Sequence, residues 1–126
     1  MHERRQHTRY QLTPPLRGRA SIDDFGQCDA QLIDVSIEGA QMILELGNAE
    51  ALARFLALQE KAINCAFPRS GGMPWKFVLL HTRMTTVNED DAVGGKCVIA
   101  GRFVAVPNFT EADLGQMVTT LLAVAI

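Results

Sequence analysis

Short apolar segments separated by turn residues fill most of the chain from residue 16 to residue 106, which leaves room for strands rather than long helices. Gly, Asp, Asn and Pro recur between the segments, as in Asp23-Asp24-Phe25-Gly26. Short alternating segments bounded by such residues are typical of antiparallel strands in a small barrel or a strongly curled sheet. The pattern predicts six strands: Leu16–Ile22, Cys28–Val35, Ala40–Leu46, Ile63–Phe67, Trp75–Val87 and Lys96–Val106.

Two segments have helical spacing instead. Ala49–Lys61 is rich in Ala, Leu and Glu, and Asn48 before it is a suitable N-cap. Near the end, Thr110 and Asp113 have the spacing of a capping box. An apolar stripe with i, i+3, i+4 periodicity then predicts a terminal helix, with the positions Leu114, Met117, Val118, Leu121, Leu122 and Ala125. This stripe either covers the open side of the sheet or binds a partner.

These elements predict a mainly β domain of six short antiparallel strands, in a small barrel or a strongly curled sheet, with a short inserted helix and a C-terminal helix. With 126 residues the chain has the usual length of one domain. We expect a basic arm over residues 1–13, the barrel over 14–109 and the terminal helix over 110–126. Pro14-Pro15 cannot lie inside a helix and separates the arm from the barrel.

Composition excludes several classes of protein. The sequence contains no run of about 18 apolar residues, so we expect no membrane insertion. No apolar segment follows the basic N-terminus, as it would in a signal peptide. The dispersed cysteines and histidines predict neither a disulfide framework nor a metal site, and a cytoplasmic location is the simplest expectation. These residues are Cys28, Cys65, Cys97, His2, His7 and His81.

The formal net charge of −2 conceals an uneven distribution. Residues 1–19 contain five arginines and one glutamate, a net charge of +4. The remaining 107 residues carry 7 basic and 13 acidic side chains, a net charge of −6. Arginine suits bidentate contacts to phosphates and guanine edges. The basic segment therefore indicates either an anion-binding element or a solvated tail, and charge alone does not choose between them.

Two motifs lie 25 positions apart. Arg4-Arg5-Gln6-His7-Thr8-Arg9 fits R-R-x-x-x-R, and Asp34-Val35-Ser36-Ile37-Glu38-Gly39 fits D-x-S-x-x-G. In this order, flanking the first predicted strands, they resemble the signature of the PilZ domain family. Gly101-Arg102-Phe103 is similar to a late strand of that family. The helical segment Ala49–Lys61 departs from the strand-rich middle of the family, which leaves the local topology there open.

The resemblance implies a six-stranded antiparallel PilZ-type β-barrel with a short inserted helix and a C-terminal helix. It also implies that the domain binds cyclic di-GMP and acts as a receptor or adaptor, without enzymatic activity or a cofactor. The ligand offers two phosphates and two guanines, which arginines can grip or stack upon. By resemblance, Asp34 accepts hydrogen bonds from guanine N1–H and N2–H₂, and Ser36 bonds to a base or phosphate. The ligand-binding residues implied are Arg4, Arg5, Arg9, Asp34, Ser36 and Gly39.

The entropic cost of ordering the arm explains why several arginines are needed. Fixing the backbone costs about 1–2 kcal/mol per residue, which one phosphate contact does not offset. We therefore expect Arg5 and Arg9 to act together, with the ligand ordering the arm and creating a surface for a downstream protein. One alternative is a nucleic-acid-binding module, which the acidic body and the single aromatic Tyr10 disfavour. The other is a protein-interaction module with a vestigial nucleotide site, acting through its C-terminal helix.

Overall fold

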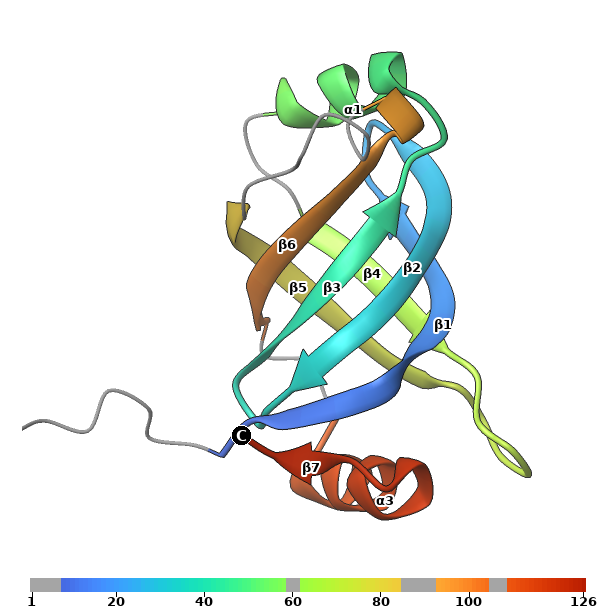
Figure 1. Ribbon diagram of the computed structural model, residues 1–126, viewed down its shortest axis with the longest axis vertical. Coiled ribbons are helices and arrows are strands. Elements are labelled where there is room, and N and C mark those ends of the chain that lie inside the picture. Colours follow the sequence, from blue (N-terminus) through green and yellow to red (C-terminus); the bar gives the residue numbers. More distant parts are fainter. Residues whose placement is uncertain (1–7, 59–61, 85–92, 105–108) are drawn as a thin grey trace, which may run out of the picture.

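Six antiparallel strands close into a barrel, with the helices labelled α1 and α3 at its opposite ends (Figure 1). The computed structural model describes residues 8–58, 62–84, 93–104 and 109–126, except for the side chains of residues 81–84. The strand order β2-β3-β6-β5-β4-β1 closes because β1 also pairs with β2. The barrel strands are β1 (Tyr10–Ile22), β2 (Gly26–Val35), β3 (Gly39–Glu45), β4 (Ala62–Phe67), β5 (Trp75–Met84) and β6 (Lys96–Phe103).

The alternation of apolar residues turns one face of each strand into the barrel. In β2 the buried side chains include Cys28, Ala30 and Leu32, and β3 buries Met42 and Leu44 in the same way. This period of two is what strands require when one face is covered. The mainly β architecture and the six-stranded barrel predicted from the sequence are confirmed.

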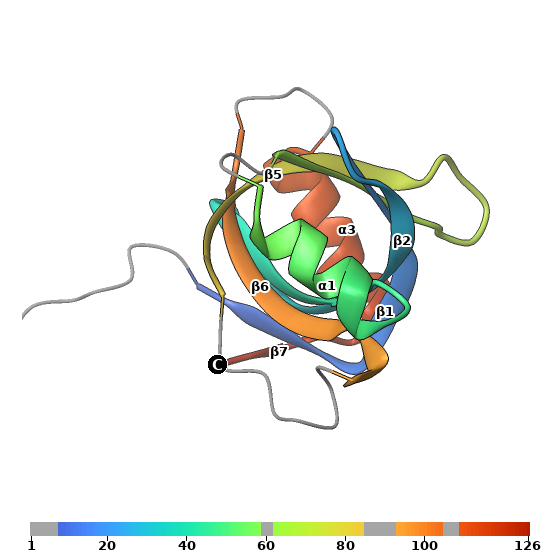
Figure 2. The same ribbon diagram turned by 90° about the horizontal axis from the view of Figure 1, so that it is seen from above.

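Helix α1 (Ala49–Leu56) lies across one end of the barrel, as the view from above shows (Figure 2). Asn48 is its N-cap and its side-chain oxygen accepts a hydrogen bond from the Ala51 N–H at 2.8 Å, as predicted. Phe55 is fully buried beneath the helix. The helix is shorter than the predicted segment Ala49–Lys61, and residues 59–61 lie outside the described part of the chain.

Helix α3 (Glu111–Leu121) lies at the opposite end and confirms the predicted capping box at Thr110 (Figure 1). Its buried Met117 belongs to the same core cluster as Phe77 and Phe109, whose ring centroids lie 5.3 Å apart. The prediction of a helix through residue 126 is wrong. Leu122 takes a left-handed conformation with φ 53°, and the chain then forms a two-residue strand, β7 (Val124–Ala125).

Strand β1 also begins earlier than predicted. It starts at Tyr10, whereas the sequence pattern places residues 1–13 in the arm and starts the strand at Leu16. The register between β1 and β2 shifts between Gln11, which pairs with Asp34, and Leu16, which pairs with Leu32. Four residues of β1 (12–15) therefore lie between these pairs, against one residue of β2 (Ile33). Pro14-Pro15 lies inside this irregularity, where the missing N–H groups leave the ladder intact on either side. The prolines therefore mark a bend within one strand instead of its beginning.

The ends of the other strands agree with the prediction within a few residues. Strand β5 ends at Met84 and β6 at Phe103, whereas the predicted strands continued to Val87 and Val106. Residues 85–92, which include most of the predicted hairpin connection, and residues 105–108 lie outside the described part of the chain. Within the described residues, none of the helices has both the length and the apolar character that a membrane span requires.

Candidate functional site

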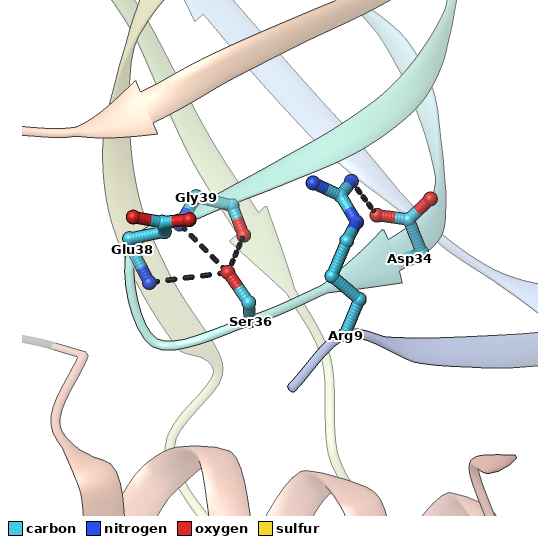
Figure 3. Close-up of polar contacts among 5 residues, drawn as sticks. All are labelled: Arg9, Asp34, Ser36, Glu38 and Gly39. Carbon is cyan, nitrogen blue, oxygen red and sulfur yellow. Dashed lines mark hydrogen bonds and ion pairs between the residues drawn. The ribbon is translucent and has the colours of Figure 1, made fainter. Parts of the chain in front are cut away.

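Asp34 and Arg9 join the two sequence motifs at one end of the barrel. The Arg9 guanidinium donates to Asp34 Oδ1 in an ion pair that spans 25 positions of the chain (Figure 3). The Asp34 side chain is 8% exposed and that of Arg9 is 22% exposed. A carboxylate this deeply buried needs a paired cation, and Arg9 provides it.

Irregular strand pairing places Asp34 at this point. The β2 ladder shifts register just before Asp34 against both of its neighbours, β1 and β3. Register shifts of this kind redirect side chains near the ends of strands. Asp34 and Val35 are both buried as a result, and β2 ends with the carboxylate facing the first residues of the described chain.

Ser36 holds the turn between β2 and β3. Its Oγ accepts hydrogen bonds from the N–H groups of Glu38 at 3.2 Å and Gly39 at 3.3 Å (Figure 3). The Ser36 N–H donates to the Gly39 carbonyl at 2.9 Å. Ser36 is fully buried, so its hydroxyl serves the backbone of the turn. A direct bond from this hydroxyl to a ligand stays a prediction.

Gly39 is required by close packing of the backbone. A Cβ atom at this position would lie 2.2 Å from the Gly101 carbonyl oxygen of β6. Its φ is not in the left-handed region, so the close packing against β6 and not the backbone conformation requires glycine here. Gly101 is similarly constrained, since a Cβ there would lie 2.7 Å from the Leu80 carbonyl oxygen. The two glycines bring β3, β6 and β5 together beside the turn.

Arg4 and Arg5 lie outside the described residues, as does His7. Of the six site residues predicted from the sequence, the structure therefore brings four together: Arg9, Asp34, Ser36 and Gly39. Arg102 was not assigned a site role, yet it pairs with Gly39 in the ladder and has an exposed side chain. The similarity of Gly101-Arg102-Phe103 to a family strand was the only signal for it.

A cavity of about 390 Å³ lies between the start of β1, the turn and α3, and neither Arg9 nor Asp34 is among the residues that line it. Its volume is in the range of small-molecule sites. Sequence reasoning missed Thr8, Tyr10 and Ile37 as lining residues, because only the fold brings them to the helix. On α3 the lining residues recur at helical spacing, and they are Glu111, Leu114, Gly115, Val118 and Thr119.

The cysteines lie inside the barrel, away from this site. All three are buried free thiols. Burial, with a smaller contribution from Cys97, raises the pKa of the Cys28 thiol to about 11, and burial raises the pKa of Cys65 further. Protonated thiols of this kind are poor nucleophiles. Among the described residues, no three His, Cys, Asp or Glu side chains are grouped as a metal ion requires.

Neither protein-family models nor curated proteins give a match to the sequence. Solved structures do. The PilZ domain of YcgR from Escherichia coli, solved with c-di-GMP, matches with a TM-score of 0.65 and 18% identity, over 95% of this chain and 92% of that one. The Bacillus subtilis inhibitor of motility, MotI/DgrA, matches with a TM-score of 0.56 and 12% identity, over 96% of this chain and 50% of that one. The six-stranded barrel described above, with its terminal helix, is therefore a PilZ-type fold.

Proposed function

We propose that the protein is a cyclic di-GMP receptor. The observation that supports this most strongly is the ion pair between Arg9 and Asp34, since it joins the last arginine of R-R-x-x-x-R to the first residue of D-x-S-x-x-G. The fold adds support, because the similar domain of YcgR was solved with this ligand. The role is that of a binding module in the cytoplasm, without catalysis.

Cyclic di-GMP complements both members of the pair. Guanine N1–H and N2–H₂ are two parallel donors that match the two oxygens of a carboxylate, and each phosphate matches a guanidinium. Binding is then an exchange, in which guanine donors replace Arg9 at Asp34 while Arg9 takes a phosphate or a guanine edge. Neither buried charge loses its partner in this exchange, so the desolvation cost that opposes breaking a buried pair is avoided.

The remaining predicted residues have separate roles in this proposal. Arg5 and Arg4 supply further contacts from the arm, and several such contacts together offset the cost of ordering it. Ser36 acts as a positioning residue by fixing the turn that follows Asp34. Gly39 keeps the turn close against β6, beside the exposed Arg102.

The ligand-bound arm then forms part of a new surface that a downstream protein recognises. Coupling of this kind, in which a ligand orders a segment that a partner reads, is a common switching device. A second candidate function is a protein-interaction module that acts through its C-terminal segment with a vestigial nucleotide site. The observation that favours it is the exposed apolar end of this segment, where Leu122 is 83% exposed.

Calorimetric titration tests the proposal with three ligands of graded chemistry. Cyclic di-GMP should bind at micromolar or lower concentration. Cyclic di-AMP keeps both phosphates, but its adenine has no N1–H or N2–H₂ to offer Asp34, so its binding should be at least tenfold weaker. A single-stranded oligonucleotide should bind weakly and with a steep salt dependence that the cyclic dinucleotide does not share. Equal affinity for both cyclic dinucleotides would refute the assigned role of Asp34.

Variants assign the site to its residues. Arg9→Ala and Asp34→Ala should each lose most of the affinity for cyclic di-GMP, and Arg5→Ala should weaken it. Arg19→Ala is the matched control, because Arg19 forms an exposed ion pair with Asp29 elsewhere on β1 and β2. No binding of cyclic di-GMP by the unmodified protein at tens of micromolar ligand would refute the proposed function and favour the interaction module.

A further inference from the structure

The C-terminal strand β7 contacts the backbone of the proposed ligand-binding arginine. The Ile126 N–H donates to the Arg9 carbonyl oxygen at 2.9 Å. Next to this bond, Tyr10 pairs with Ala125 and Gln11 pairs with Val124. On its other side the same part of β1 pairs with the end of β2, where Gln11 lies opposite Asp34. β7 therefore converts the start of β1 from an edge into an internal strand.

The path of the chain into β7 uses an unfavourable backbone conformation. Leu122 has φ 53°, a left-handed conformation that glycine usually adopts at the end of a helix. The Ala123 N–H closes the turn on the Val118 carbonyl at 3.0 Å. The turn reverses the chain so that β7 runs beside the start of β1, below the barrel (Figure 1).

Side-chain burial gives a second indication of what β7 does. Val124 and Ile126 are 64% and 54% exposed, so these apolar side chains contribute little to the core. The segment is held instead by backbone hydrogen bonds to β1. Its effect thus falls on the backbone of residues 9–11, which carries the Arg9 side chain to Asp34.

We propose that β7 is a positioning element for Arg9, which fixes the backbone of the arginine before the ligand arrives. This inference rests on the proposed binding of cyclic di-GMP at Arg9 and Asp34. Fixing the backbone in advance removes part of the entropy that binding would otherwise lose. Binding at Arg9 and docking of β7 are then coupled, so each stabilises the other.

A pair of proline variants tests the hydrogen bond from the Ile126 N–H to the Arg9 carbonyl oxygen. Ile126→Pro removes the donor of this bond. Successive N–H groups of a strand point to opposite sides, so the Ala125 N–H points away from β1 and Ala125→Pro spares the bond. We expect Ile126→Pro to weaken the binding of cyclic di-GMP about five- to tenfold by calorimetry, the effect of freeing about one residue. Ala125→Pro and Ile126→Ala, which keeps the N–H, should bind within about twofold of the unmodified protein.

A measurement without ligand separates this inference from the proposed function. Hydrogen exchange of the Arg9 guanidinium, followed by NMR, should be several times faster in Ile126→Pro than in Ala125→Pro, because the ion pair with Asp34 opens more often. The folded state of each variant is verified by its thermal transition. If the unmodified protein does not bind cyclic di-GMP, the proposed function fails and the exchange rates still decide whether β7 positions Arg9. Equal exchange rates, or equal affinities, in the two proline variants would overturn the inference.

Discussion

Asp34→Asn tests whether the ion pair that joins the two motifs is a strong interaction in the folded protein. Breaking a fully buried pair by removing one charge costs about 3–5 kcal/mol, and an exposed pair contributes about 0–1 kcal/mol. The exposed fractions of 8% for Asp34 and 22% for Arg9 place this pair between the two cases. We expect the free energy of unfolding to fall by about 2 kcal/mol.

Thermal and urea unfolding at neutral pH measure this loss. For 126 residues, an unfolding entropy of about 2.1 cal/mol/K per residue converts 2 kcal/mol into a decrease in Tm of about 8 °C. The barrel offers a matched control in Arg19 and Asp29, an ion pair of 2.9 Å whose side chains are 60% and 62% exposed. Asp29→Asn should cost less than about 0.5 kcal/mol.

A double-mutant cycle attributes the loss to the pair itself. Arg9→Gln and Asp34→Asn should cost clearly less in combination than the sum of the two single changes, because each removes the same interaction. The reasoning is refuted if Asp34→Asn costs no more than Asp29→Asn, or if the two changes at the site are additive.

Three further predictions concern the backbone and the core. Gly39→Ala should lower the free energy of unfolding, measured in urea, by about 2–3 kcal/mol, since its Cβ would lie 2.2 Å from the Gly101 carbonyl oxygen. Gly115→Ala in α3 is its control: there a Cβ meets nothing within 4 Å, and the free energy of unfolding should rise by up to about 1 kcal/mol. Leu122→Gly should leave stability unchanged or raise it by up to about 1 kcal/mol, because glycine adopts φ 53° without a steric cost, and a loss of 1 kcal/mol would contradict this. The pKa of Cys28, raised from 9.0 to about 11, means that the folded state binds the thiol proton more tightly than the unfolded state, so this contribution to stability is complete below pH 9 and declines between pH 9 and 11. Urea midpoints across this range should fall less steeply in Cys28→Ala, and equal slopes would refute the assignment.

Local signals in the sequence predicted most of the barrel. Alternating apolar residues marked the strands. Asn48 and Thr110 marked the starts of α1 and α3 through the same hydrogen bonds that the structure contains. These features depend on residues only a few positions apart in the chain, so they can be predicted from the sequence pattern alone. The closure of the barrel through β1 and β2 followed from the family resemblance rather than from any local pattern.

The wrong predictions came from residues whose conformation depends on distant contacts. Leu122 continues the apolar stripe of α3, and the sequence has no glycine or proline at this position to indicate the left-handed turn before β7. Pro14-Pro15 suggested a boundary, whereas pairing with β2 and β7 extends β1 to Tyr10. Register between strands determines both outcomes, and register is not visible in the sequence of a single strand.

The sequence predicted which residues belong to the candidate site better than it predicted how they contact one another. The motifs indicated that Arg9 and Asp34 face one ligand, but their pairing with each other emerges only from the register of β1 and β2. The buried hydroxyl of Ser36 and the contact of Gly39 with β6 likewise depend on the folded turn. Both residues shape the site through the backbone.

The most direct test of the central claim is an NMR titration of ¹⁵N-labelled protein with cyclic di-GMP, followed at the backbone amides. The account predicts saturable shifts that are largest at Arg9 and in the turn from Asp34 to Gly39, with little change at α1 on the opposite end of the barrel. An absence of saturable shifts, or shifts confined to the α1 end, would contradict the claim that the two motifs form one site for this ligand.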